Sequence, residues 1–377
     1  MSMLKGIQLT LMIGPAVPVP APRAVVDALQ SVKITSGKDK SGFQLSFAVS
    51  KTSPLLNTLL PAGYFDPIAT RVIVMVTLGG QPHVLMDGMV TQQELAPSDE
   101  PGQSTLTITG EDLSAAMDLI ELCIPYPNMS DTVQAYATLA RYAWLGVAPI
   151  VIPGFFPEQP IMTNKIESQN GTDLEHLKLI ASNNGFVFYV EPGPLPGQSI
   201  AYLGPNIRIP VPQPALSVNM DAHTNVESLS FSLDGLAKET MLVTLDDPIT
   251  GKIPTPIPIP AVNIFQPPLG ARPTLPLKMV LAKEIGGRSV PFTLKKMLGR
   301  LLVGAANAIT VSGSLDVLRY GHVLRSKLLV GVRGAGLAYD GLYYVDSVTH
   351  SIKRGEFKQS FQLSRDGLIS LAQKVPL

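Results

Sequence analysis

Residues Leu328–Ser370 read LLVGVRGAGLAYDGLYYVDSVTHSIKRGEFKQSFQLSRDGLIS and contain two runs in which apolar and polar residues alternate. Residues Arg71–Ala115, near the other end of the chain, read RVIVMVTLGGQPHVLMDGMVTQQELAPSDEPGQSTLTITGEDLSA and follow the same pattern. Alternation with a period of two is typical of strands that bury one face, and the Gly-rich and Asp-Gly pieces between the runs are typical of turns. Both segments therefore predict antiparallel β-structure.

The two segments also correspond in order. Val72–Leu78 matches Leu328–Val332, Asp87-Gly88 matches Asp340-Gly341, and STLTITGEDL matches FKQSFQLSRDGL. We expect the glycine after each Asp to supply a turn or bulge conformation that a larger side chain resists. A chance similarity of alternating strands is the alternative. The similar spacing of the landmarks favours an internal repeat, which usually marks one structural unit used twice.

The rest of the chain divides around these segments. Residues 1–120 and 216–377 consist mainly of alternating runs separated by Gly, Pro and Asp, whereas residues 121–215 contain helical patterns. The sequence predicts a mainly β fold with an α+β insert, in which two similar antiparallel β-barrels flank a helix-containing middle region. We expect the first barrel in 1–120, the middle domain in 121–215 and the second barrel in 216–377.

Two helices are predicted in the middle region. The first begins after Ser130 as its N-cap and ends at Gly146. Its expected apolar face consists of Val133, Ala137, Ala140 and Trp144. The second helix begins with a capping box of Thr172 and Glu175 and ends at Gly185, before the buried strand FVFYV. Its apolar stripe consists of Leu174, Leu177, Ile180 and Ala181.

The second barrel carries two additions. Residues at about 246–276 are rich in proline, which removes backbone donors and favours extended, polyproline-like chain over regular ladders. We interpret this insertion as an arm that lies on a neighbouring subunit, with plain disorder as the alternative. A helix with one apolar side is predicted at about 291–305.

Composition excludes several classes of function. The chain has 377 residues with 29 basic and 29 acidic side chains and no long charge run, which argues against nucleic acid or an anionic membrane surface as the main partner. No apolar run reaches the length of about 18 residues that a membrane-spanning helix needs. Charged residues make up 15% of the chain, below the roughly 25% of ordinary soluble domains. This favours surface buried between subunits, with a large-cored monomer as the alternative.

Catalytic and metal-binding signatures are missing. The five histidines are His83, His176, His223, His322 and His350, and they form no paired metal-ligand pattern. We interpret His176 as a solvated helix residue and His350 as a surface or interface residue. The sequence therefore predicts no enzyme, no cofactor and no catalytic, cofactor-binding or metal site.

Other reactive or glycine-rich features also have structural explanations. The single cysteine, Cys123, and the single tryptophan, Trp144, are interpreted as core residues. The carboxylate neighbours Glu111-Asp112 and Asp246-Asp247 point apart in an extended chain, so turns or caps explain them better than acid–base catalysis. Gly331–Gly336 reads GVRGAG inside a β-hairpin and is no phosphate loop.

The order of these segments resembles the baseplate hub family of contractile tails, which includes the phage late control protein D and the N-terminal hub region of VgrG-type spike proteins. The resemblance rests on FQLSFAVS, VLMDGMVTQQE and STLTITGEDLSAAM in the first barrel and on YDGLYYVDSVTHSIKRGEFKQSFQLSRDG in the last. In the middle region it rests on SDTVQAYATLARYAW and SQNGTDLEHLKLIASNNGFVFYVEPG. It covers nearly the whole chain, and none of its motifs is catalytic.

The resemblance implies a structural protein with defined partners. It implies a homotrimer with pseudo-sixfold barrels that joins the hexameric tail tube to a trimeric central spike and contacts baseplate wedge proteins. The chain ends at Leu377 without a needle-like extension, so we expect the spike to be a separate protein. Assembly is expected in the bacterial cytoplasm, as part of a phage tail or injection particle. A tail-tip hydrolase or binding protein for cell wall or polysaccharide is the alternative.

The sequence also suggests regions that contact partners. The best candidates are the 14–22 loop, the strand edges around Arg71–Leu78 and the proline-rich arm.

Overall fold

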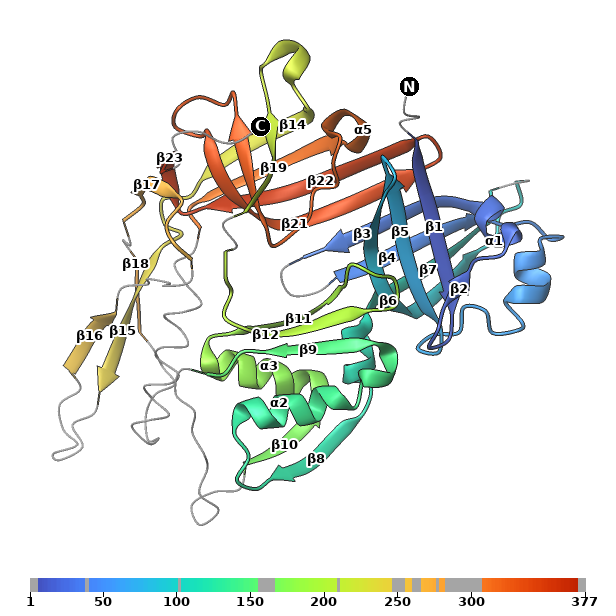
Figure 1. Cartoon of the computed structure of the whole chain (residues 1–377), viewed down its shortest axis with the longest axis horizontal. Coiled ribbons are helices and arrows are strands. Elements are labelled where there is room, and N and C mark those ends of the chain that lie inside the picture. The colour runs from blue at the N-terminus through green and yellow to red at the C-terminus, as the bar shows by residue number, and fades with distance from the viewer. Residues whose placement is uncertain are drawn as a thin grey trace.

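Strands dominate the structure, as the alternating patterns predict (Figure 1). The computed structural model describes residues 6–37, 41–100, 103–154, 167–208, 211–245, 255–259, 266–275, 278–281 and 307–371. The prediction of a mainly β fold with a helix-containing middle region is confirmed. In Figure 1 two β units lie side by side, and the middle region lies below them.

Unit 1 contains the N-terminal strands. Their hydrogen-bonded order is β1-β5-β6-β7-β4-β3, with β2 paired to the outer side of β1. In β4 the residues Phe43, Leu45 and Phe47 are buried while the residues between them are more exposed, so one face forms the core. The elements are β1 (Ile7–Gly14), β2 (Val19–Pro20), α1 (Arg23–Ala28), β3 (Leu29–Ser36), β4 (Ser41–Ala48), η1 (Leu55–Leu59), β5 (Arg71–Leu78), β6 (Gln81–Ala96), β7 (Thr105–Asp112) and η2 (Leu113–Asp118).

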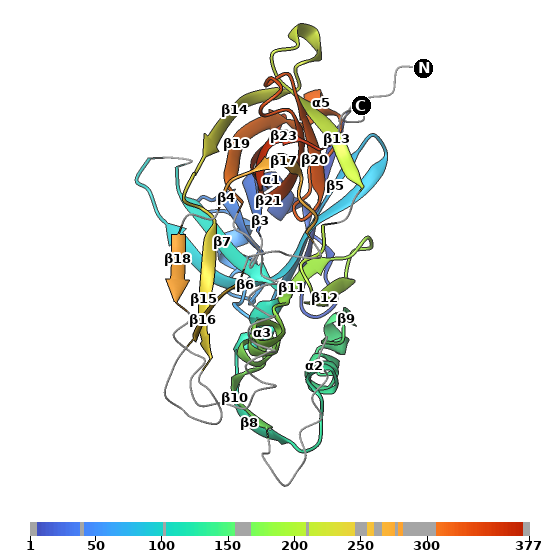
Figure 2. The same ribbon diagram turned by 90° about the vertical axis from the view of Figure 1, so that its left-hand side faces the viewer.

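Unit 2 repeats this strand order. Its strands are hydrogen-bonded in the order β13-β20-β21-β22-β19-β14. If only the six strands of each order are numbered by chain position, leaving out β2, both orders read 1-4-5-6-3-2. One orientation differs, because β1 and β5 are antiparallel whereas β13 and β20 are parallel. Figure 2 shows these strands curling around a common axis. The elements are β13 (Pro212–Ser217), η4 (Asp221–His223), β14 (Val226–Leu233), β19 (Ile309–Asp316), α5 (Val317–Tyr320), β20 (Leu329–Arg333), β21 (Gly341–Lys353) and β22 (Glu356–Arg365).

Two β-bulges also recur at matching positions. Between β6 and β7 the register shifts from Val90 to Gln92, and between β21 and β22 it shifts from Val345 to Ser347. When unit 1 is aligned with unit 2 on these shifts, a second pair of shifts also coincides. The shift in β3 at Leu29/Ser31 then lies at the same position as the shift in β14 at Val226/Ser228. Bulges are specific local features, so two coincidences of register indicate a true structural repeat.

The residue-level alignment from sequence is wrong by two positions. With the bulges aligned, Asp87 of β6 corresponds to Leu342 of β21, not to Asp340. Asp87 lies inside a strand and pairs with Arg71, whereas Asp340 accepts a hydrogen bond from the backbone N–H of Ala335 in the turn before β21. The dipeptides Asp87-Gly88 and Asp340-Gly341 therefore have different structural roles.

The two units share one ladder. β3 of unit 1 pairs antiparallel with the second half of β21 in unit 2, from Ser31–Lys353 to Ser36–Val348. The path β14-β19-β22-β21-β3-β4-β7-β6 is therefore one continuous sheet across both units. One hydrophobic core cluster extends from Leu11 in unit 1 to Leu363 in unit 2.

The middle region has its own core, which includes Leu139, Leu174, Leu177 and Phe188. The second predicted helix is confirmed in detail. Thr172 and Glu175 form the capping box, the predicted stripe is buried, and Gly185 ends the helix with φ 66°. The elements are β8 (Glu121–Tyr126), α2 (Asp131–Ala140), η3 (Ala143–Leu145), β9 (Val147–Val151), β10 (Glu167–Thr172), α3 (Asp173–Asn184), β11 (Val187–Pro192) and β12 (Ser199–Gly204). β10 pairs with β8, and the other sheet has the order β11-β12-β9.

The predicted face of the first helix is wrong. Ser130 is the N-cap, but α2 ends at Ala140 and a turn separates it from the short helix η3, which Gly146 terminates. The buried face of α2 carries Ala135, Thr138 and Leu139. The predicted apolar face, from Val133 to Trp144, lies outside, and Trp144 is 64% exposed.

Part of the proline-rich insertion forms a regular ladder, contrary to the prediction. β16 (Thr255–Ile259) pairs antiparallel with β15 (Glu239–Leu245), which also pairs with β18 (Lys278–Leu281). β16 is an edge strand, and its prolines alternate, so their missing N–H groups can all face the outer edge. β17 (Gly270–Pro273) pairs with β23 (Gly367–Ser370). Residues 246–254, 260–265 and 276 of the insertion and the helix predicted at about 291–305 lie outside the described residues.

The close approach of strands in unit 1 makes Gly110 sensitive to substitution. A Cβ atom at Gly110 would lie 2.3 Å from the carbonyl oxygen of Met89 and 2.3 Å from the Phe43 ring. We expect Gly110→Ala to lower the free energy of unfolding by about 1–3 kcal/mol, as overpacking does. Urea unfolding measures the change. Gly235→Ala is the control, because a Cβ there meets nothing within 4 Å, and equal effects of the two variants would contradict the prediction.

Candidate functional site: a polar sheet face and its two edges

The described part of the chain holds no group of three or more His, Cys, Asp or Glu side chains that could bind a metal ion. Two interpretations from sequence are wrong. His176 is buried and stacks on Tyr126, with ring centroids 5.3 Å apart. His350 is also buried, and its Nδ1 lies 2.9 Å from the amide nitrogen of Gln359. Both sit on the core side of their elements, which local sequence did not reveal.

The single cysteine and the single tryptophan are exposed, so the core assignments are wrong. Cys123 lies on the outer face of β8, and its Sγ donates to Oδ1 of Asn170 at 3.2 Å. Its neighbours Leu122 and Ile124 are less exposed, as alternation along a strand requires. Trp144 lies on η3 beyond the end of α2.

The interpretation of Asp112 as a cap is confirmed. Its carboxylate accepts hydrogen bonds from the backbone N–H groups of Ser114 and Ser41, which starts η2 and fixes the beginning of β4. Burial raises the pKa of Asp112, and these hydrogen bonds oppose that rise. Gly331–Gly336 lies in the β20–β21 hairpin as predicted, since residues 331–333 end β20 and Gly334 follows at φ 86°. Asp246 and Asp247 lie outside the described residues.

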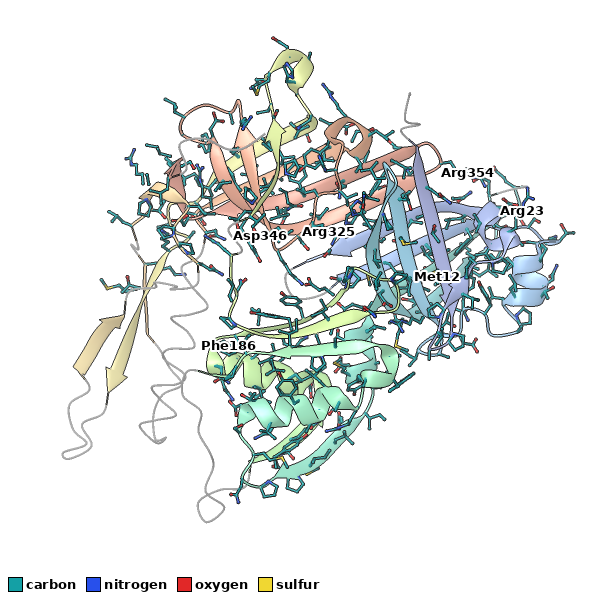
Figure 3. All side chains as sticks on the ribbon, in the orientation of Figure 1. Met12, Arg23, Phe186, Arg325, Asp346 and Arg354 are labelled. Carbon is teal, nitrogen blue, oxygen red and sulfur yellow. The ribbon has the colours of Figure 1, made fainter. Side chains whose placement is uncertain are left out.

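A cavity of about 410 Å³ lies where unit 1, unit 2 and the middle region meet. Lys327 sits above the Tyr189 ring at 3.2 Å, and its Nζ is 3.5 Å from Glu191. Tyr189 stacks on Tyr202 with centroids 5.2 Å apart. Figure 3 shows Arg325 on the side of unit 2 that faces the middle region. These contacts hold the middle region against unit 2, so the cavity belongs to a structural junction.

The most extensive functional candidate is the non-core face of the shared sheet. Rows of polar side chains, most of them uncharged, cross it from β14 to β6, because cross-strand partners share a face. The hydroxyl oxygens of Ser228 and Ser314 lie 2.8 Å apart, and those of Thr35 and Thr349 lie 3.2 Å apart. The face includes Ser228, Ser230, Ser232, Thr310, Ser312, Ser314, Ser360, Gln362, Thr349, Ser351, Ser31, Thr35, Gln44, Ser46, Thr107, Thr109 and Gln92.

The opposite face of the same sheet is core. Its residues include Val32, Leu45, Ile108, Val348 and Phe361, all of which are buried. The sheet thus has one face that binds apolar side chains and one face rich in hydroxyl and amide groups. The polar face also carries charged side chains, among them Lys33 between Ser31 and Thr35, Glu94 beside Gln92, and Lys358, whose Nζ lies 2.9 Å from Glu227. Such a face binds water or polar surfaces.

The shared sheet ends in an open edge on each side. Among the described strands, β14 pairs only with β19. At the other end, residues Gln92–Ala96 of β6 pair with β7, while the pairing with β5 stops at Met89 and backbone bonds from Val90 reach only Thr70 and Ile68. Open edges present unpaired N–H and C=O groups and are sites of strand addition.

The other suggested contact regions have different outcomes. β5 is not an edge, because all eight residues of Arg71–Leu78 pair with β1 on one side and with β6 on the other. That suggestion is wrong. The 14–22 loop contains the exposed side chains Val17 and Val19, and its role as a contact stays a prediction.

No protein-family model matches the sequence, and no curated protein matches it significantly. Solved structures do match. The tail protein from Neisseria meningitidis MC58 aligns with a TM-score of 0.61 at 15% identity, covering 97% of this chain and 98% of that chain. The 43 kDa tail protein of prophage MuSo2 from Shewanella oneidensis aligns with a TM-score of 0.59 at 14% identity, covering 96% and 100%. A chain of the Francisella PdpA–VgrG complex gives 0.56 at 10% identity, with 100% of this chain and 55% of that chain covered. At these identities the similarity establishes a shared fold.

Proposed function

We propose that this chain, which has the fold shared by phage tail proteins and VgrG components, is the structural baseplate hub of a contractile tail or injection system. In this proposal it is a homotrimer that joins the hexameric tail tube to a trimeric central spike. The observation that carries the proposal is the internal repeat, with the same strand order and coincident bulges in both units.

The repeat explains how such a joint can work. A ring of three chains presents six similar β units, so its one face can meet a sixfold partner while the other meets a threefold partner. Closed cyclic symmetry is the common form of protein rings, and it needs heterologous contacts between unlike surfaces of neighbouring copies. The polar face of the shared sheet would then line the central space of the ring.

Other features agree with a structural role. A hydrolase would need a carboxylate pair in a cleft, whereas the adjacent carboxylates of the sequence are better explained as turns or caps. At the junction cavity, Lys327 contacts Glu191 and Arg325 contacts His83. Within the described residues no helix is long and apolar enough to cross a membrane. We extend the proposal to a tail tube protein, a separate spike protein and baseplate wedge proteins as partners, and to assembly in the bacterial cytoplasm. The boundaries 1–120, 121–215 and 216–377 remain our proposed domain division.

The oligomeric state tests the proposal directly. We expect mass photometry and light scattering to give three times the monomer mass, and negative-stain images to show threefold rings with a central opening. A protein that stays strictly monomeric at high concentration would contradict the hub. Clearing of cell wall in a zymogram would favour the tail-tip hydrolase instead.

A further inference from the structure

We infer that β14 of one copy pairs antiparallel with the second half of β6 of the next copy, so that the shared sheet continues from chain to chain. This inference rests on the proposed ring, and it names the contact that closes it. It follows from the internal repeat and from the β3–β21 ladder within one chain.

The β3–β21 ladder is the template for the contact. It joins the second strand of unit 1 to the second half of the fifth strand of unit 2, with Ser36 opposite Val348 and Thr35 opposite Thr349. On the core side Ile34 lies opposite His350, and both are buried. On the polar side the Thr35 and Thr349 hydroxyls touch at 3.2 Å.

The same two strand types recur with open edges. With the bulges aligned, β14 is the counterpart of β3, and the second half of β6 is the counterpart of the second half of β21. Within the described part of the chain, both counterparts lack the partner that the template has. The chain therefore contains one complete ladder between units, β3–β21, and two open-edged strands that could form a second ladder of the same kind.

The exposure of apolar side chains on β14 and on the second half of β6 supports the inferred pairing. Leu95 of β6 is the counterpart of His350, yet it is 45% exposed where His350 is 4% exposed. At the other edge, Phe231 is the counterpart of the fully buried Ile34 but is only partly buried, and the neighbouring Leu233 is 42% exposed. Covering these side chains would complete the core face of the sheet in the way β3 and β21 complete it internally.

The template fixes the register of the new ladder. Transferring each pair to its counterparts places Leu233 opposite Gln93, Ser232 opposite Glu94, and Phe231 opposite Leu95. Leu95 and Phe231 form an apolar cross-strand pair on the core face, and Glu94 faces a hydroxyl on the polar face.

The occupant of each edge is a second copy of this chain. Each copy offers one β14 edge and one β6 edge at opposite ends of the continuous sheet, so neighbours can join head to tail. A head-to-tail contact that closes produces a ring, and a ring leaves no exposed edge to aggregate.

Cysteine cross-linking tests the ladder and its register. In a Cys123→Ser background, we would combine Glu94→Cys with Ser232→Cys, then treat the protein with a copper oxidant and, in parallel, with a short bis-maleimide. We expect covalent dimers and trimers on a non-reducing denaturing gel. Thr35→Cys with Thr349→Cys is the positive control, because it places the same pair in the template and should link within one chain.

A register control and the oligomeric state separate the possible failures. Glu94→Cys with Ser228→Cys keeps the face but shifts the partner by roughly 14 Å along the strand, at about 3.4 Å per residue. We expect it to link at least fivefold less. If mass photometry shows trimers but Glu94/Ser232 stays unlinked while Thr35/Thr349 links, the ladder is overturned and the hub survives. Preferential linking of the Ser228 pair also overturns the register, whereas a strictly monomeric protein overturns the proposed function itself.

Discussion

Replacing Arg71 by methionine should lower the free energy of unfolding by about 3–5 kcal/mol, the cost of leaving a buried charge without its partner. Arg71 and Asp87 are both buried and form a bidentate ion pair, with Nε–Oδ1 and Nη2–Oδ2 distances of 2.7 Å. Nη1 of Arg71 donates to the carbonyl of Ala16, and Oδ2 of Asp87 accepts from the Ser199 hydroxyl in the middle region. The pair therefore joins β5, β6, the β1–β2 turn and β12.

The chain offers a matched control for this substitution. Arg23 and Asp27 form an ion pair of 3.3 Å on the exposed side of α1, so Arg23→Met should cost less than about 1 kcal/mol. The double variant Arg71→Met/Asp87→Leu should recover much of the loss, since it removes both buried charges. Urea unfolding followed by circular dichroism measures all three. An Arg71→Met loss no larger than that of Arg23→Met would show that the pair is not needed.

The sequence predicted features that depend on local pattern. Alternation identified the strands of both units, because a strand that buries one face must alternate wherever it lies. The α3 helix was predicted to its caps, since Thr172, Glu175 and Gly185 act within one turn of the helix ends. The sequence indicated that a pattern of strands is repeated, and the structure shows the same hydrogen-bonded strand order in both units. The match of Asp87 to Asp340 was wrong by two positions.

Features that depend on tertiary contacts were not predicted correctly. α2 has apolar residues on both sides, so periodicity could not tell that Leu139 faces the core while Val133 faces out. The burial of His350 depends on β3 and β22, which are distant in sequence. The shared β3–β21 ladder and the two open edges are likewise set by pairing between remote strands.

His350 should make the protein less stable as the pH falls from 7 to 5. Burial, with a smaller contribution from the positive charge of Arg325, lowers the pKa of His350 to about 3. The unfolded chain has a histidine pKa of about 6.5, so the unfolded state binds an extra proton between pH 6.5 and 3. Stability contributed by neutral His350 is present above pH 6.5 and is lost below it, at up to about 1.4 kcal/mol per pH unit. From pH 7 to 5 the loss is about 2 kcal/mol.

Comparing slopes isolates this contribution from the other titrating groups. His350→Gln removes the titration, so its unfolding free energy should fall about 2 kcal/mol less between pH 7 and 5 than that of the parent, whatever its stability at pH 7. His223→Gln is the control because His223 is exposed in η4, and its slope should match the parent. Urea unfolding at several pH values provides the comparison. The variant His350→Gln could instead show the same dependence of unfolding free energy on pH as the parent, which would contradict the prediction. Because His350 lies in the β3–β21 ladder, that result would mean that the ladder accommodates a charged imidazole and is more hydrated than its burial indicates.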